Sequence, residues 1–105
     1  MLYSYHVTVG LESVAWSVDE CREHALALAD EYFPDGYTVI DAQGRWASPE
    51  RGPISEPSLV FIFTELDDND PYLQRVHKFA TVYKTVACQD AVLVQPYHCA
   101  QAQLV

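Results

Sequence analysis

One stretch of this chain, DGYTVIDAQGRW (35–46), holds the side chains best suited to binding or catalysis. They follow a turn at residues 35–36. An acid, an amide, a guanidinium and an indole lie within six positions near the end of the stretch. Such groups can form a polar rim beside an aromatic surface, which suits a small ligand. We add two residues from neighbouring strand positions and predict these ligand-binding candidates: His6, Tyr37, Asp41, Gln43, Arg45 and Trp46.

In an enzyme, His6 or Asp41 would be the acid or base of this site. A purely structural interpretation of the stretch is also open. Asp35 and Gly36 are typical turn residues, and a glycine at position 44 allows a positive φ. The tryptophan could then simply cover the core.

Two groups of residues invite a metal. Asp67, Asp68 and Asp70 offer oxygen ligands, but a calcium loop starting at Asp68 would need Gly and Glu where Leu73 and Phe79 stand. We therefore expect these acids to favour a helix N-terminus.

His6, His98 and Cys99 supply three ligands where zinc usually takes four. The chain has no GxSxG, HExxH, GxGxxG or phosphate-binding glycine loop. We predict neither a metal nor a cofactor, and we name no catalytic residue.

Composition restricts the possible partners. The 105 residues carry 15 acidic and 6 basic side chains, a net charge of −9, which disfavours direct binding to nucleic acid. The three cysteines show no paired spacing, which fits a reducing compartment. The chain has no apolar run long enough for a membrane span and no signal-peptide pattern at its start, so we expect a cytoplasmic protein.

Hydrophobic periodicity predicts six regular elements. Alternation favours strands, Ser17 and Glu20 form a capping-box pattern, and Pro71 suits the first turn of a second helix after an Asp70 cap. Three prolines and a glycine predict a loop over residues 47–57. The expected elements are strands at 2–10, 37–42, 58–66 and 91–98 and helices at 17–33 and from about 71 to 88.

This β-α-β-β-α-β order predicts one domain, residues 1–105, of the α+β class. A ferredoxin-like arrangement would form a four-stranded antiparallel sheet with two helices on one face. The other face would stay uncovered, although residues 59–63 are apolar on both sides. We therefore predict a homodimer that pairs sheet to sheet or edge to edge.

Several blocks resemble an uncharacterised bacterial family of unknown function. The specific block is FPDGYTVIDAQGRW at residues 33–46, which is similar to the family's FPDGxTVxDAQGxW signature. The weaker blocks depart from the family pattern, because Pro57 interrupts a Glu-Ser pair and residues 85–88 lack its arginines. The resemblance implies no established activity, and the weaker matches are Glu56, Ser58, Tyr83, Lys84, Gln89, Asp90 and Val92.

Two classes of function remain. The leading prediction is a small, acidic, non-enzymatic interaction module that binds and inhibits a protein with a basic surface, as phage anti-defence inhibitors do. The alternative is a small-molecule-binding or sequestering protein, or a small enzyme, with its site at the dimeric sheet face. For the first class, the partner-binding candidates are Asp19, Glu20, Glu23, Asp30 and Glu31.

Overall fold

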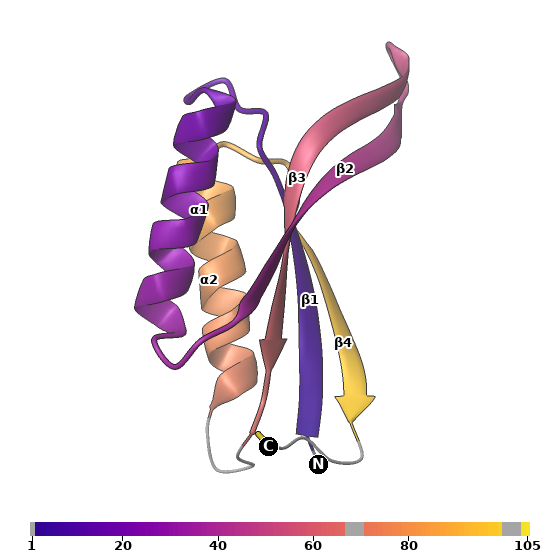
Figure 1. Cartoon of the computed structure of the whole chain (residues 1–105). Helices are drawn as coiled ribbons and strands as arrows, with labels where there is room; N and C mark the ends of the chain where they lie inside the picture. Colours follow the sequence, from indigo (N-terminus) through magenta and orange to yellow (C-terminus); the bar gives the residue numbers. More distant parts are fainter. Residues whose placement is uncertain (1, 67–70, 100–103) are drawn as a thin grey trace.

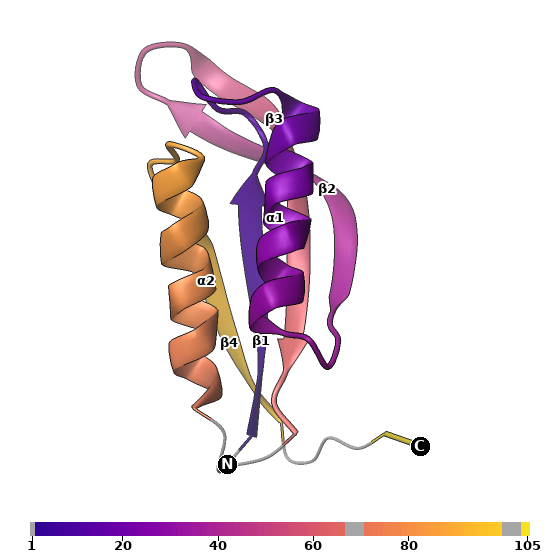
Figure 2. The same ribbon diagram turned by 90° about the vertical axis from the view of Figure 1, so that its left-hand side faces the viewer.

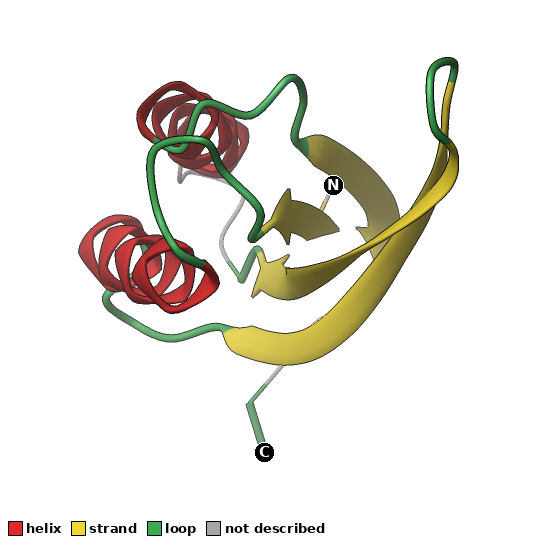
Figure 3. Ribbon diagram, turned by 90° about the horizontal axis from the view of Figure 1, so that it is seen from above, coloured by secondary structure: helices red, strands yellow, loops and turns green. Residues whose placement is uncertain are grey.

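The computed structural model describes residues 2–66, 71–99 and 104–105. Four strands form one antiparallel sheet in the order β2-β3-β1-β4. Both helices cover the same face of this sheet (Figures 1 and 3). This confirms the predicted ferredoxin-like α+β arrangement, whose elements are β1 (Leu2–Gly10), α1 (Val18–Tyr32), β2 (Thr38–Ser48), β3 (Gly52–Thr64), α2 (Tyr72–Val86) and β4 (Leu93–Cys99).

The core lies between the sheet and the helices. On β1 the odd-numbered residues Tyr5, Val7 and Val9 are buried, while their neighbours at positions 4, 6 and 8 are only half-buried, as alternation predicts. Aromatic side chains of β3 and α2 fill the centre of this layer. The largest fully buried side chains are Tyr83, Phe61, Phe63, Phe79 and Leu11.

The two helices begin differently. Ser17 caps α1: its hydroxyl accepts a hydrogen bond from the Glu20 N–H at 3.2 Å, and the Glu20 carboxylate accepts one from the Ser17 N–H at 3.1 Å. This confirms the predicted capping box. The structure starts α2 at Tyr72, with Pro71 in the cap position. The expected cap, Asp70, and its neighbours Asp67 and Asp68 lie outside the described residues.

The prediction of a loop over residues 47–57 is wrong. β2 and β3 instead form a long hairpin that projects past the other strands (Figure 1), with Ser48 paired to Gly52. Pro53 and Pro57 fit into β3 because β1 pairs only with its later part, from Ser58 onward. Both prolines direct their backbone away from β2, toward the β1 side, where Pro57 only accepts a hydrogen bond from the Leu11 N–H. Neither proline therefore removes a ladder hydrogen bond between β2 and β3.

Within the described part of the chain, neither helix combines the length and apolar character that a membrane span requires.

Candidate functional site

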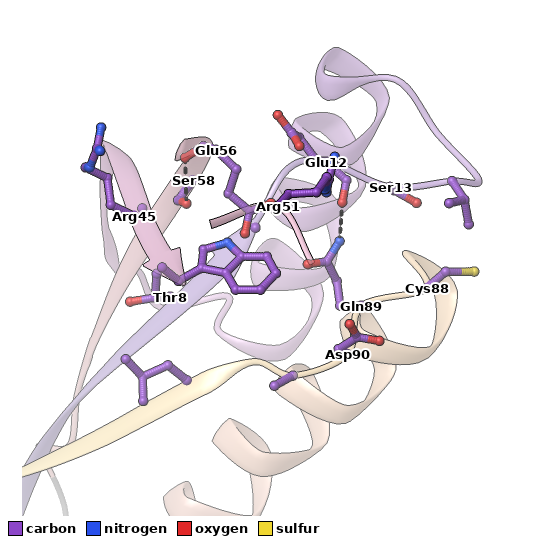
Figure 4. Close-up of a pocket in the computed structure, with 16 residues that line it drawn as sticks. Thr8, Glu12, Ser13, Arg45, Arg51, Glu56, Ser58, Cys88, Gln89 and Asp90 are labelled. Carbon is purple, nitrogen blue, oxygen red and sulfur yellow. Dashed lines mark hydrogen bonds between the residues drawn. The ribbon is translucent and has the colours of Figure 1, made fainter. Parts of the chain in front are cut away.

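A pocket of about 730 Å³ opens at the end of the sheet from which the hairpin projects (Figure 4). Three segments far apart in sequence meet there: the end of β1 with the following loop, the hairpin, and the turn between α2 and β4. Figure 2 shows these segments gathered at the same end of the molecule. The charged, amide and aromatic side chains of the lining are Glu12, Arg45, Trp46, Arg51, Glu56, Gln89 and Asp90.

Gly10 makes room for the two head groups at the centre of this pocket. A Cβ atom at this position would lie 2.7 Å from Glu56 Oε1 and 2.8 Å from Gln89 Oε1. Both distances are shorter than carbon–oxygen contact allows. The missing side chain of Gly10 is therefore the space in which a carboxylate from β3 and an amide from the α2–β4 turn approach each other.

The Glu56 carboxyl group lies in a partly dehydrated environment. Burial raises its pKa, and the nearby Glu12 carboxylate adds to the rise. Hydrogen bonds from the Glu12 backbone and the Trp46 side chain act in the opposite direction and only partly offset it. Glu56 therefore holds a proton at a higher pH than an ordinary glutamate, which suits it to exchange a proton or to receive a cation.

The loops around the pocket are tied to one another. Gln89 Nε2 donates to the Glu12 carbonyl at 2.6 Å, and the Ser13 hydroxyl donates to the Ala87 carbonyl at the same distance. Cys88 between them adopts a positive φ of 53°, which turns the chain out of α2 and directs Gln89 toward the site. The β1–α1 loop and the α2–β4 turn therefore form one connected wall.

Tyr83 supports the floor of the pocket from the core. Its hydroxyl donates to the carbonyl of Gly10 at 2.5 Å, and the side chain is fully buried. Burial is the main cause that raises the Tyr83 pKa, and the neighbouring Cys21 adds to it. The phenol thus stays protonated and donates to the carbonyl of Gly10, the residue next to which the Glu56 and Gln89 head groups lie.

We expect Tyr83→Phe to lower the free energy of unfolding by about 1–3 kcal/mol, because the buried Gly10 carbonyl loses its donor. Urea denaturation followed by circular dichroism measures this change. Tyr37→Phe is the matched control, since the Tyr37 hydroxyl donates to the exposed Asp30 carboxylate at 2.6 Å and its loss should cost less. Equal losses in the two variants would contradict the supporting role of Tyr83.

Two of the six ligand-binding candidates line the pocket, Arg45 and Trp46. Trp46 is 49% exposed, so part of its ring is free to contact a ligand. Figure 4 shows the Arg45 side chain turned away from Gln89, toward the outside of the hairpin.

The other four candidates lie elsewhere. The His6 ring packs against Tyr97 on the open face of the sheet, with centroids 4.3 Å apart. Asp41 forms an ion pair with Arg22 of α1, and Gln43 donates to Ser55.

Tyr37 is the fourth of these candidates. It packs against Phe61 and Phe63, and burial and Asp30 together raise its pKa to about 12. Its ring therefore belongs to the helix side of the sheet. Which of the six candidates contact a ligand stays a prediction.

The acidic candidates on and beside α1 are all exposed. Glu20 is engaged in the capping box, where hydrogen bonds from Ser17 lower its pKa. Asp30 accepts the hydrogen bond from Tyr37. The remaining members of this set are Asp19, Glu23 and Glu31.

The two histidines among the possible zinc ligands lie on opposite faces of the sheet, and the Cys99 side chain lies outside the described part of the structure. His98 pairs with Tyr3 and lies 5.7 Å from its ring, whereas His6 lies on the face opposite to that of Tyr3. Among the residues that the structure describes, no three His, Cys, Asp or Glu side chains gather closely enough to hold a metal ion.

The central residues of the pocket belong to no recognisable catalytic or binding motif. Gly10 is the last residue of the predicted strand 2–10, and Glu12 is one of the fifteen acidic residues, so neither stands out in the sequence. Glu56, Ser58, Gln89 and Asp90 stood among the weaker family blocks without a role, and all four line the pocket. The family blocks were thus the signal that could have found the site.

Comparison with known proteins identifies the family. A family model described as "Protein of unknown function (DUF3574)" matches residues 25–101, which is most of the chain. The chain belongs to this DUF3574 family. The predicted membership of a family of unknown function is confirmed. No curated protein matches the sequence significantly.

Solved structures share the fold of this DUF3574 protein. A phage SAM lyase in complex with S-methyl-5'-thioadenosine superimposes with a TM-score of 0.70 and 15% identity, over 91% of this chain and 80% of that chain. The apo state of a phage SAM lyase gives a TM-score of 0.69 and 14% identity, over 90% and 78% of the two chains. At such low identity the similarity establishes the fold alone.

These comparisons overturn the leading functional prediction. The first choice, a non-enzymatic acidic inhibitor of a basic partner, was wrong, because the similar solved structures are those of an enzyme, a phage SAM lyase, with and without a bound small molecule. The alternative, a small-molecule-binding protein or small enzyme, is the better supported class. The acidity of α1 suggested the inhibitor, but acidic residues serve solubility in many small proteins and specify no partner.

Proposed function

We propose that this DUF3574 protein binds a SAM-type small molecule in the pocket at the end of its sheet and acts on it as a small enzyme. The observation that carries the proposal is the partly dehydrated Glu56 carboxyl group beside Trp46, above Gly10. The fold shared with a phage SAM lyase supports the choice of ligand.

The pocket offers a partner for each part of such a ligand. SAM carries a positive sulfonium, which a partly buried carboxylate such as Glu56 attracts. Its adenine ring can stack on the exposed face of an indole such as Trp46, and the ring can also hold a cation. The guanidinium of Arg51 is available in the lining for the carboxylate of the ligand.

A lyase reaction on SAM needs no redox partner. The bond between the sulfur and the four-carbon amino-acid chain breaks, and its electron pair stays on the sulfur. The carboxylate of the amino-acid chain forms a bond to the carbon that the sulfur leaves, so this fragment departs as a lactone and no proton is gained or lost. The positive sulfonium becomes a neutral thioether, S-methyl-5'-thioadenosine. In our proposal Glu56 holds the sulfonium before cleavage, and the surrounding walls reduce its contact with water.

The two compounds differ in charge, which makes them a matched pair of probes. We expect calorimetric titration to show that Glu56→Gln weakens SAM binding about 10- to 100-fold, the effect of losing about 1.5–3 kcal/mol from a charged contact. Binding of neutral S-methyl-5'-thioadenosine should change much less. The control is Glu50→Gln, which removes an exposed carboxylate of the same hairpin that lies outside the pocket lining.

The pH dependence gives the same proposal a second readout. A bound cation favours the ionised form of Glu56, so SAM binding below the raised pKa of this group requires loss of a proton. The affinity for SAM should therefore rise as the pH rises through the range just above the ordinary pKa of glutamate, and then level off. The Glu56→Gln variant should lack this rise, and absence of SAM binding to the wild type would refute the proposal.

Incubation with SAM distinguishes an enzyme from a protein that only sequesters the ligand. Release of S-methyl-5'-thioadenosine, detected by chromatography, identifies an enzyme. Tight binding without release identifies a sequestering protein.

A further inference from the structure

The two edges of the sheet differ in their capacity to pair with another strand. The Glu65 N–H donates to the Tyr3 carbonyl at 3.0 Å, and the Leu11 N–H donates to the Pro57 carbonyl at 2.9 Å. The backbone N–H and C=O groups of the odd-numbered residues of β1 therefore point toward β3. The even-numbered residues of β1 face β4. Pro96 of β4 is paired with the odd-numbered Tyr5, so its backbone faces outward, where a proline offers no N–H to another strand. The β4 edge is thus interrupted at its centre, which protects it from pairing.

The β2 edge has no such protection. Its eleven residues, Thr38–Ser48, contain no proline, and β2 ends the sheet on this side (Figure 2). Because Pro57 faces β1, the even-numbered residues of β3 face β2, and their partners on β2 are also even-numbered. The outward N–H and C=O groups therefore belong to Val39, Asp41, Gln43, Arg45 and Ala47.

We propose that a second copy of this chain pairs with β2 in antiparallel orientation, about a two-fold axis at Gln43. In this register Asp41 lies opposite the partner's Arg45, and Arg45 lies opposite the partner's Asp41. Directly opposed unlike charges stabilise an antiparallel pair. The Asp41 side chain is 77% exposed and keeps room for this contact beside its ion pair with Arg22.

The same register matches the apolar side chains of the strand. Ile40 and Trp46 are exposed by 47% and 49%, although both are large and apolar. With the axis at Gln43, Ile40 lies beside the partner's Trp46 on the open face of the sheet. Pairing would reduce the exposure of both side chains to water and continue the sheet across two subunits.

Neighbouring registers lose these matches. An axis at Asp41 or at Arg45 places like charges opposite each other, which is destabilising. An axis at Ala42 sets the partner's Arg45 against Val39, and an axis at Gly44 sets the partner's Ala47 against Asp41. Strand β2 is therefore self-complementary about Gln43 in both charge and apolar surface.

The interface would brace one wall of the pocket. Trp46 belongs to the pocket lining, and the partner's Ile40 would pack beside it. The inference does not rest on the identity of the ligand, because it follows from backbone direction, charge and exposure along β2.

Light scattering of the whole chain at micromolar concentration tests the association. We expect the mass of a dimer, and Arg45→Asp should raise its dissociation constant about 10- to 100-fold because it sets two acids opposite each other. Circular dichroism checks that the variant is folded. A monomer, a trimer, or a dimer indifferent to Arg45→Asp would overturn the proposal.

Cross-linking tests the register independently. In a chain with Cys88→Ser and Cys99→Ser, we expect Gln43→Cys to form a covalent dimer on mild oxidation, since opposed Cα atoms lie about 5.5 Å apart. The control is Ala47→Cys on the same edge, whose two copies would be separated by roughly 27 Å along the strands. Cross-linking at position 47 and not at position 43 would contradict the two-fold axis.

Discussion

The Gly10→Ala variant is expected to fold with nearly the stability of the wild type but to bind SAM about 10- to 100-fold more weakly. The added methyl group would fall within 2.8 Å of the carboxylate of Glu56 and the amide of Gln89. Both groups are the ends of flexible side chains that can swing away at little cost. The fold should therefore tolerate the change, whereas the geometry of the site should not.

Calorimetry with SAM, together with urea denaturation, separates these two effects. Gly44→Ala is the control, because the nearest neighbour of a Cβ there would be the Ser58 hydroxyl at 3.1 Å, and Glu56 would lie at ordinary contact distances of 3.8 and 3.9 Å. Unchanged affinity in Gly10→Ala would show that Glu56 and Gln89 do not act together on the ligand.

The Phe63→Ala variant is expected to lose about 3–5 kcal/mol of stability, a large part of the roughly 5–15 kcal/mol typical of a small domain. Phe63 is fully buried and stacks on Phe33 with ring centroids 3.8 Å apart. Its ring also meets Phe79 of α2 edge-on at 5.3 Å. Truncation would leave a cavity at the junction of sheet and helices, which surrounding aromatic rings cannot fill without reorientation.

Thermal or urea unfolding measures this loss. The matched control is Leu73→Ala, which shortens a large apolar side chain on α2 that is 47% exposed. That change should cost far less. A similar loss in both variants would show that the cluster around Phe63 is not the centre of the core.

Local patterns were sufficient for most of the fold. Alternation on β1 and the Ser17–Glu20 capping box depend on neighbouring residues, and the structure confirms both. The hairpin was missed because proline is judged locally, while its cost depends on whether a third strand lies alongside. Pro53 and Pro57 lie where β3 extends past β1, a fact that only the register between these strands supplies.

The site was harder to predict for the same reason. Glu56 and Gly10 are far apart in sequence, and they meet only because Gly10 pairs with Ser58 on β3. Gln89 reaches them through the turn after α2, which depends on the positive φ of Cys88. Trp46 and Arg45 were predicted because they are chemically distinctive, whereas a glutamate and a glutamine between proline-rich and polar neighbours carry no local signal.

The stretch 35–46 now has two proposed uses. Trp46, near its end, lines the pocket, while the alternating residues 39–47 form the exposed edge of the sheet. The opposite charges of Asp41 and Arg45, which first suggested a ligand rim, fit better with self-association in our proposal. The ligand site itself depends more on Glu56.

Nuclear magnetic resonance titration of the isotopically labelled chain with S-methyl-5'-thioadenosine tests the central claim most directly. We predict that the side-chain N–H signals of Trp46 and Gln89 shift, together with the backbone amides of Gly10 and Glu56. Signals along the hollow between α2 and β4, such as those of His77 and Val92, should stay in place. An absence of shifts, or shifts confined to that second hollow, would contradict a ligand site at the end of the sheet.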